Sequence, residues 1–394
     1  MGASAASFEV RSERVQTVAA TIGRALLEVE SPAMCLVFCA GKLAGELARL
    51  AELLAPRQRC PIIFASGPGV LTERRELEGE TAATGLVWAD RGVELQLGRS
   101  EGAPTEADLR ELLGPGTPQR PTLLLLRSEG FDPEHLWRLR ASTPNPRVFG
   151  AGTYGSPGLV AAVDGKVRPV SALALRFTQG RPPLIQTAHS CRLLSEPLPI
   201  TRSRGSMVDE INGEPALAVL ERLGALAGET SERGRQARPL LFTVLSPPRA
   251  GDDVALASEL AGRDAENRDL LVRGIQGVDP GRRSLLISAE AQPGMLITFA
   301  VKDGLAARDE MSRICRQAGR NLAGAAPRFA LYFNCSGRGK SLHLGPNVDT
   351  RILREQFAGL SVAGFQSAFE IGPFDGAPAL QLYTGMLAIF ASSS

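Results

Sequence analysis

Short apolar runs recur along the chain at a regular spacing, and this repeat is the strongest constraint on the fold. Each run opens a similar unit and is followed by a helical or mixed segment, such as AGELARLAELLA from Ala44. Short apolar runs bounded by Gly and Pro are typical of strands. The four opening strands are MCLVFCA from Met34, TLLLLRS from Thr122, PLLFTVLS from Pro239 and FALYFNCS from Phe329.

Two further strands follow each opening strand at similar intervals. A strand with a glycine-rich exit comes after roughly 25 to 30 residues, and a closing strand comes about 25 residues later. The strands with glycine-rich exits are PIIFASGPGVL from Pro61, RVFGAGTYGSPGLV from Arg147, LLVRGIQGVDPG from Leu270 and SVAGFQSAFEIGP from Ser361. The closing strands are GLVWAD from Gly85, ALALRF from Ala172, MLITFAVKD from Met295 and GMLAIFA from Gly385. We therefore predict four divergent strand–helix–hairpin units, arranged two and two.

The strand patterns favour the α+β class, with two lobes of mixed, mostly antiparallel sheets and helices. Alternation in GKVRPVSALALRF, from Gly165, suggests antiparallel pairing, whereas the leucine run after Thr122 suggests a strand buried on both faces. A doubly wound parallel fold is the alternative, but no GxGxxG motif opens a helix after the first strand.

The length of 394 residues favours two or three domains. We predict domains over residues 32–190 and 191–394, with the division in the stretch from Ser190 to Gly234. Asn212–Gly213 in this stretch is a turn signal, and Pro215 suits the first turn of a following helix. The apolar positions of that helix are Leu217, Leu220 and Leu223.

The composition argues against nucleic-acid and membrane partners. Formal net charge is only +2, and aromatic residues make up 5% of the chain. We expect a cytoplasmic protein, because no signal peptide or apolar run of roughly 18 residues is apparent. None of the six cysteines shows paired CxxC spacing, so we expect neither a metal site nor a cofactor.

Several motifs resemble the FIST family, with an N-terminal and a C-terminal FIST domain in tandem. The most specific lie in the second half: VDEINGEPAL, LLVRGIQGVDPGRRSLLISAEAQPGMLITFAVKD, FNCSGRG and GFQSAFEIGP. The first half is compatible through MCLVFCA, PIIFASGPG and FGAGTYGSPG. One departure is Phe369, which precedes Glu370–Ile371 where the family often has glycine.

The resemblance implies a sensory module that binds small molecules such as amino acids. The sequence shows no kinase, cyclase, methyl-accepting or F-box segment, so we expect a stand-alone sensor whose signalling partner is supplied in trans. The ligand would be an amino acid or a small carboxylate. A protein-interaction scaffold without a ligand is an alternative.

The candidate ligand site is the turn Cys335–Gly339, together with Phe365 and Glu370. Its residues are Cys335, Ser336, Gly337, Arg338 and Gly339. Glycines allow a ligand to approach the backbone closely, and an arginine fork suits a carboxylate. Glu370 beside aromatic residues suits an ammonium group. Arg338 and Glu370 would hold the two poles of an amino acid, or they would pair with each other in a purely structural contact.

Two further possibilities concern hydroxyl and thiol groups. Thr153, Tyr154 and Ser66 occupy the corresponding turns of the first half, where they line a second pocket or serve only as turn residues. Cys335 would be a nucleophile if a base such as His343 stood beside it. No GxSxG signature supports acyl transfer, so we expect a protein that is not an enzyme.

Overall fold

The structure is a computed structural model, which describes residues 4–89, 92–114, 120–139, 147–229, 241–247 and 270–392. The chain divides into two compact units, of which the first is Met1–His189 with Arg308–Ser394 and the second is Ser190–Ala307. The start of the second unit coincides with the predicted division at residue 190. The chain returns to the first unit at Arg308, so residues 191–394 do not form one lobe.

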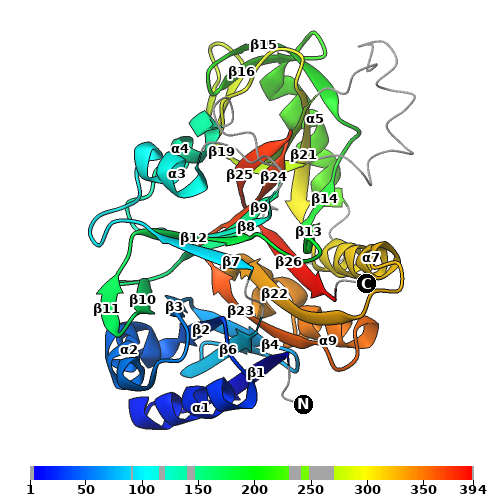
Figure 1. The fold of residues 1–394 in the computed structure, drawn as a ribbon. Helices are drawn as coiled ribbons and strands as arrows, with labels where there is room; N and C mark the ends of the chain where they lie inside the picture. The colour runs from blue at the N-terminus through cyan, green and yellow to red at the C-terminus, as the bar shows by residue number, and fades with distance from the viewer. Residues whose placement is uncertain are drawn as a thin grey trace. The chain divides into compact units, whose positions relative to one another are not determined.

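The described residues of the first unit form three six-stranded sheets (Figure 1). The first sheet has the order β1 (Ala5–Val10), β6 (Ala82–Trp88), β2 (Met34–Ala40), β3 (Ile62–Ser66), β10 (Leu159–Val163) and β11 (Lys166–Pro169). The second has the order β7 (Val93–Leu97), β12 (Ala172–Phe177), β8 (Thr122–Arg127), β9 (Val148–Thr153), β24 (Glu370–Phe374) and β25 (Ala377–Gln381). The third has the order β13 (Leu184–His189), β26 (Thr384–Ala391), β22 (Pro327–Cys335), β23 (Ser361–Ser367), β4 (Gly69–Thr72) and β5 (Glu76–Glu78).

All three sheets follow one plan. The opening strand pairs parallel with the next predicted strand, as β2 with β3, β8 with β9 and β22 with β23. The opening strand also pairs antiparallel with the closing strand, as β2 with β6, β8 with β12 and β22 with β26. The predicted α+β class with mixed, mostly antiparallel sheets is confirmed, and three of the four predicted units form structural repeats.

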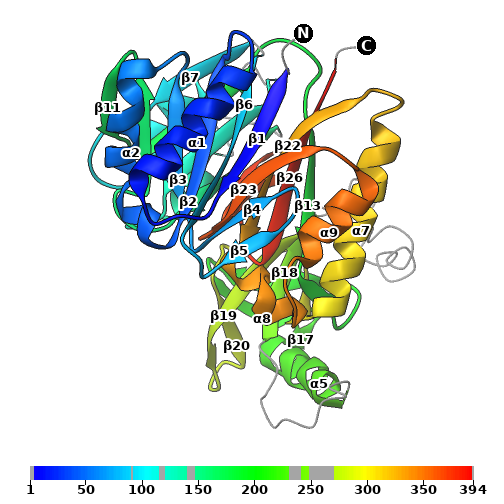
Figure 2. The ribbon, with the colours of Figure 1, turned by 90° about the horizontal axis from the view of Figure 1, so that it is seen from below.

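Each repeat donates its hairpin to another repeat. The hairpin β4–β5 of the first repeat pairs with β23, and β24–β25 of the third pairs with β9. The hairpin β10–β11 of the second repeat pairs with β3, which completes the cycle. Figure 2 shows β4 beside β23, although these strands are far apart in the sequence. Because each of these three sheets, as described, includes a hairpin from another repeat, the three repeats depend on one another for their edges.

Helices cover the outer faces of the sheets, and the inner faces form a shared core (Figure 2). The first sheet is covered by α1 (Val15–Glu28) and α2 (Leu47–Leu54), with the short turns η1 (Gly41–Gly45) and η2 (Ala55–Arg57). The second is covered by α3 (Glu106–Leu113) and α4 (Glu134–Arg138), and the third by α7 (Gly304–Asn321) and α9 (Val348–Gln356). Residues of all three inner faces meet in one cluster that includes Phe38, Leu125 and Phe333. This burial on both faces explains the continuous apolar runs of the opening strands.

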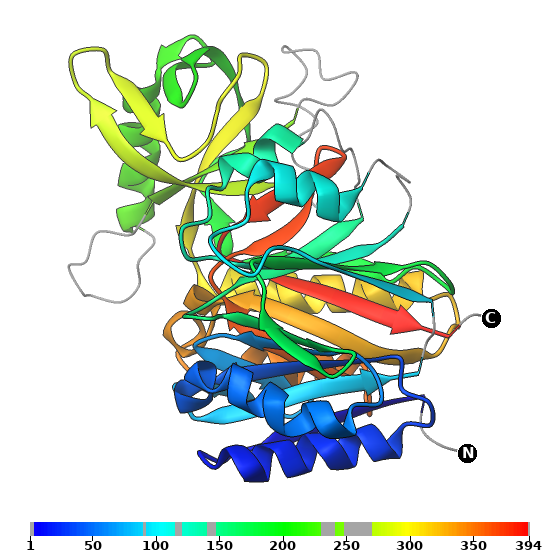
Figure 3. The same ribbon diagram turned by 60° about the vertical axis from the view of Figure 1, so that its left-hand side comes forward.

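The second unit is a small barrel with the helix α5 (Ala216–Glu229), as Figure 3 shows. Its strands close because β18 pairs with both β19 and β21. The strands are β14 (Cys191–Leu193), β15 (Leu198–Arg204), β16 (Met207–Ile211), β17 (Glu214–Pro215), β18 (Leu241–Ser246), β19 (Leu271–Asp279), β20 (Ser284–Ile287) and β21 (Leu296–Lys302). The predicted turn is confirmed by positive φ at Asn212 and Gly213, and the helix begins one residue after Pro215.

The predicted arrangement two and two is wrong. The opening strand predicted at Pro239 lies in the barrel as β18, where it pairs antiparallel with β19, whereas β2 pairs parallel with β3. These strands are therefore not equivalent, and the described residues form three equivalent repeats, with the barrel following β13 in the chain. Strand spacing indicates where strands begin, but it does not determine the direction in which neighbours pair.

Candidate functional site

The predicted turn follows β22 as the short helical turn η5 (Ser336–Arg338), which leads into α8 (Lys340–His343). Gly339 lies against the exchanged hairpin, because a Cβ there would lie 2.4 Å from Glu78 Oε2 and 2.7 Å from Gln366 Nε2. The Lys340 N–H donates to the same Glu78 carboxylate at 2.8 Å. Glycine is therefore needed at this turn because the backbone there lies very close to protein groups of the first and third repeats.

Arg338 lies inside the fold with its side chain fully buried. Its Nε donates to Asp349 Oδ2 at 2.6 Å and its Nη2 to Asp349 Oδ1 at 3.2 Å. Its Nη1 donates to the carbonyls of Ala188 and His189 at 3.3 and 3.2 Å. The guanidinium that the sequence suggested for a ligand anion therefore already holds an internal one, and its partner is Asp349 rather than Glu370.

Asp349 is the centre of a buried polar network that the sequence analysis missed. The Tyr332 hydroxyl donates to Asp349 Oδ2 at 2.7 Å, and His343 Nε2 lies 3.3 Å from Oδ1. Burial alone would raise the pKa of Asp349, but Arg338 beside it holds that pKa well below the usual range. The aspartate is thus a fixed negative charge within the third repeat.

Glu76 joins this network from the exchanged hairpin. Its Oε1 accepts from the Thr350 N–H at 3.1 Å, and its own N–H donates to Asn347 Oδ1 at 2.7 Å. Burial, together with the negative charge of Asp349, raises the pKa of Glu76 to about 7. These bonds fasten the hairpin of the first repeat to the start of α9 in the third.

Glu370 is enclosed by hydroxyl groups on the inner side of the third sheet. Its Oε1 lies 2.5 Å from Ser367 Oγ, and its Oε2 lies 2.5 Å from Thr384 Oγ1. Ser367 Oγ also lies 3.1 Å from the carbonyl oxygen of Asn334, which can only accept. If the single hydroxyl proton of Ser367 serves that carbonyl, Glu370 must carry the proton shared with Ser367. Burial raises the pKa of Glu370 to about 8, in agreement with this assignment.

The predicted aromatic wall for an ammonium group does not fit this geometry. Phe365 is fully buried in the core and stacks on Phe38 with ring centroids 5.2 Å apart. Phe369 stacks on Phe131 at 5.6 Å, and a Cβ on Gly152 would lie only 2.5 Å from its ring. Gly152 therefore provides the room for the bulky residue at the position where this sequence departs from the FIST motif.

The structure does bring Tyr154 to the predicted turn. The Tyr154 hydroxyl lies 3.1 Å from Ser336 Oγ, and Tyr154 is 39% exposed. The preceding Thr153 is buried at the end of β9. The Tyr154 carbonyl oxygen also accepts a hydrogen bond from the Ser66 hydroxyl at 2.5 Å. The exits of β3, β9 and β22 therefore gather at one end of the first unit.

Replacing Tyr154 by Phe should change the free energy of unfolding by less than about 1 kcal/mol, because the bond to Ser336 is exposed to water. Urea unfolding of Tyr154→Phe and Ser336→Ala would check this. A larger loss in both variants would show that this bond holds the second and third repeats together.

Two amides beside the turn are the clearest sign of an incomplete site. Asn334 and Gln366 are register neighbours on β22 and β23, and both are almost fully buried. Among the described residues, no hydrogen-bond partner exists for either amide atom of Asn334 or for Gln366 Nε2. We call Asn334 and Gln366 the amide pair. Its adjacency to Gly339 places it next to the predicted turn.

Cys335 and His343 lie on opposite sides of the third sheet. Cys335 continues the inner row of Leu331 and Phe333, whereas His343 approaches the network on the helix-covered side through Asp349. The geometry thus gives no support to a Cys335–His343 dyad.

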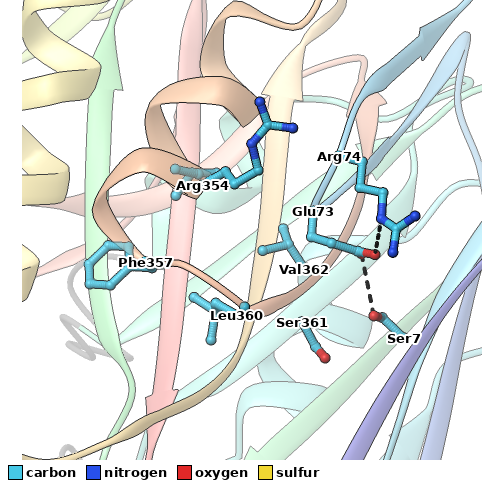
Figure 4. Close-up of a pocket in the computed structure, with 10 residues that line it drawn as sticks. Ser7, Glu73, Arg74, Arg354, Phe357, Leu360, Ser361 and Val362 are labelled. Atoms are coloured by element: carbon cyan, nitrogen blue, oxygen red, sulfur yellow. Dashed lines mark hydrogen bonds and ion pairs between the residues drawn. The ribbon is translucent and has the colours of Figure 1, made fainter.

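An open surface pocket of about 280 Å³ lies elsewhere in the first unit (Figure 4). It is formed by the end of α9, the start of β23, the β4–β5 turn and β1, and no predicted site residue lines it. Glu73 lies at its edge, where it accepts from Ser7 at 3.3 Å and lies 3.7 Å from Arg74. Arg354 lines it from α9, and Phe357 lines it from the position just after that helix.

The comparisons with known proteins identify the family. The FIST N domain model matches residues 33–214, and the FIST C domain model matches residues 220–373. The chain belongs to the FIST family. FIST domains are recognised as sensory domains associated with signalling. The FIST C match spans barrel strands and the third repeat, so the family boundary differs from the division into compact units.

Relatives of this FIST protein occur in mycobacteria. Two uncharacterized proteins of Mycobacterium tuberculosis, from strains CDC 1551 and H37Rv, are each 29% identical over 207 residues. The match covers 52% of this chain and 49% of each relative. An uncharacterized protein of Mycobacterium bovis is 28% identical over the same length and the same shares. The match thus spans about half the length of these curated relatives.

No helix in the described part of the chain is both long enough and apolar enough to cross a membrane.

Proposed function

We propose that this FIST protein is a cytoplasmic small-molecule sensor in signal transduction, whose ligand is an amino acid or another small carboxylate. Its signal would pass to a protein partner supplied in trans. The observation that carries the proposal is the amide pair, because Asn334 and Gln366 are buried beside the predicted turn with unused donors and acceptors. An amide offers both kinds of group, which suits a ligand that carries ammonium and carboxylate groups.

The energetics favour an occupant for the amide pair. A buried polar group without a partner costs about 1–3 kcal/mol, and native proteins satisfy most such groups with protein, water or ligand. Asn334 contributes two such atoms and Gln366 a third. A small polar molecule that bonds to all three would remove this cost, and its binding would stabilise the folded state by mass action.

The test is a thermal-shift screen of the full chain against the common amino acids and small carboxylates. A ligand that binds only the native state at one hundred times its Kd stabilises it by about 2.7 kcal/mol, which is a clear rise in Tm. A scaffold without a ligand would show no response to any compound. In that case the sensory proposal is wrong, and a protein-interaction scaffold without a ligand becomes the better explanation.

Replacing Asn334 by Leu should abolish the response to the screened ligand while raising stability without ligand by about 1–3 kcal/mol. The physical reason is that Leu has a similar size but removes two buried atoms that lack partners. Arg354→Ala, beside the surface pocket of Figure 4, is the matched control and should respond like the wild type. If Asn334→Leu still responds and Arg354→Ala does not, the ligand binds in that surface pocket instead.

A further inference from the structure

The three repeats place three residues at equivalent positions on the inner face, one each at the ends of the opening, second and closing strands. These residues are Ala40, Gly67 and Ala82 in the first repeat, Arg127, Thr153 and Ser171 in the second, and Cys335, Ser367 and Thr384 in the third. A fourth equivalent residue lies at the start of each exchanged hairpin. It is Val70 in the first repeat, Leu159 in the second and Glu370 in the third. The first repeat is therefore wholly apolar at this place.

In the third repeat these positions form an occupied carboxyl site. Ser367 and Thr384 each contact one oxygen of the Glu370 carboxyl group at 2.5 Å. All three side chains are fully buried. The pair of hydroxyls at the strand ends is thus arranged to bind both oxygens of a carboxyl group that enters from the hairpin side.

In the second repeat the same hydroxyls are present but the carboxyl group is not. Thr153 is paired with Arg127 in the β8–β9 register, and the Arg127 N–H donates to the Ser171 carbonyl at 2.8 Å. Such neighbours on one face have Cβ atoms about 5 Å apart. Leu159 stands where the third repeat has Glu370. Thr153 and Ser171 are both buried. Because Leu159 offers no polar group, neither side-chain oxygen has a partner among the described residues.

Arg127 supplies a positive charge and hydrogen-bond donors, whereas the third repeat has Cys335 at the equivalent position. Its Nε is buried and, among the described residues, has no partner, while its Nη2 lies 3.7 Å from the exposed Glu129 carboxylate. The Arg127 side chain is 16% exposed, so the group of Arg127, Thr153 and Ser171 reaches the surface through Arg127. An external carboxylate is ionised at neutral pH, and an arginine provides both the charge and the donors that it requires.

We infer that Arg127, Thr153 and Ser171 form a binding site for the carboxylate group of a small ligand, at the place where the third repeat binds its own Glu370. This inference deepens the proposed sensory function and rests on it for the identity of the ligand. Arg127 Nε and the two hydroxyls donate to the carboxylate oxygens. Amino acids and simple organic acids share this group, so either can supply it.

The experiment is calorimetric titration of the full chain with sodium acetate, with sodium chloride replaced to keep ionic strength constant, and with glycine as a second arm. Wild type should bind acetate saturably. Arg127→Gln should weaken binding at least about thirtyfold, and Ser171→Ala and Thr153→Val about tenfold each. Arg354→Ala is the control arginine variant and should bind as the wild type does. Melting of each variant without ligand checks that it folds.

The sharpest test is a variant that introduces an internal carboxyl group into the second repeat. Leu159→Glu should fill the site as Glu370 does in the third repeat, so that acetate no longer binds although all three site residues remain. Leu159→Met keeps the apolar residue and should retain acetate binding. If Leu159→Glu fails to fold, Arg127→Gln and Ser171→Ala decide the matter.

The outcomes separate this inference from the proposed function. Absence of saturable acetate binding in wild type, or undiminished binding in Arg127→Gln and Ser171→Ala, overturns the carboxylate site. Acetate binding that these variants lose supports the site even if no amino acid binds, and the sensory proposal for amino acids then falls alone. Glycine binding that is lost in Arg127→Gln supports the carboxylate site, and glycine binding that is lost in Asn334→Leu supports the amide pair.

Discussion

Arg338→Ala is expected to lower the free energy of unfolding by about 3–5 kcal/mol, whether or not a ligand is present. The change removes the partner of a fully buried aspartate and leaves Asp349 uncompensated in the interior. It also leaves the carbonyls of Ala188 and His189 without the Nη1 donor. Urea unfolding at neutral pH, with the fitted slope compared between variants, measures the effect.

Two companion variants identify the cause of that loss. Arg338→Lys keeps the charge but cannot reproduce the two-point contact with Asp349, so an intermediate loss is expected. Arg338→Met combined with Asp349→Leu removes both charges and should recover much of the stability, because the penalty belongs to the unpaired ion. If Arg338→Ala instead melts like wild type and loses only its ligand response, Arg338 is a ligand-binding residue as the sequence suggested.

The sequence predicted the strands well because apolar runs and their glycine-rich exits are local signals. The openings at Met34, Thr122 and Phe329 coincide with or overlap β2, β8 and β22. The exchange of hairpins was not predictable in the same way. Whether β4 pairs with β23 or with a strand of its own repeat depends on packing between distant segments. A spacing pattern carries no information on that choice.

The site residues show the same limit. Cys335 to Gly339 were recognised as a turn of special composition, and the structure places Tyr154 beside Ser336. The sequence suggested a ligand anion as the partner of Arg338, whereas the structure pairs Arg338 with Asp349, an ordinary helix residue in VDTRILREQ. Nothing local marks an aspartate near a helix start as a core anion, since such residues usually serve as exposed helix-end charges. Arg127 and Ser171 could be found only after the repeats were aligned through the sheet register.

Glu370→Gln should make the protein more stable than wild type at pH 8, by a margin that shrinks on the order of 4 kcal/mol when both are measured at pH 5. Burial raises the pKa of Glu370 from 4.5 to about 8, so between these values the folded state binds a proton that the unfolded state has released. Wild-type stability from this group is complete below about pH 4.5 and is lost as pH rises through about 8.

Gln is a suitable replacement because it resembles the protonated carboxyl group. Its amide nitrogen can donate to Ser367, while its oxygen accepts from Thr384, as the carboxyl group does now. Glu76, with a pKa of about 7, titrates in the same direction in both proteins, so only the difference between wild type and variant isolates Glu370. Urea unfolding at pH 5, 6, 7 and 8 supplies that difference. A difference that does not change with pH would mean that Glu370 is ionised in the folded state throughout, and that Ser367 donates to it rather than to the Asn334 carbonyl.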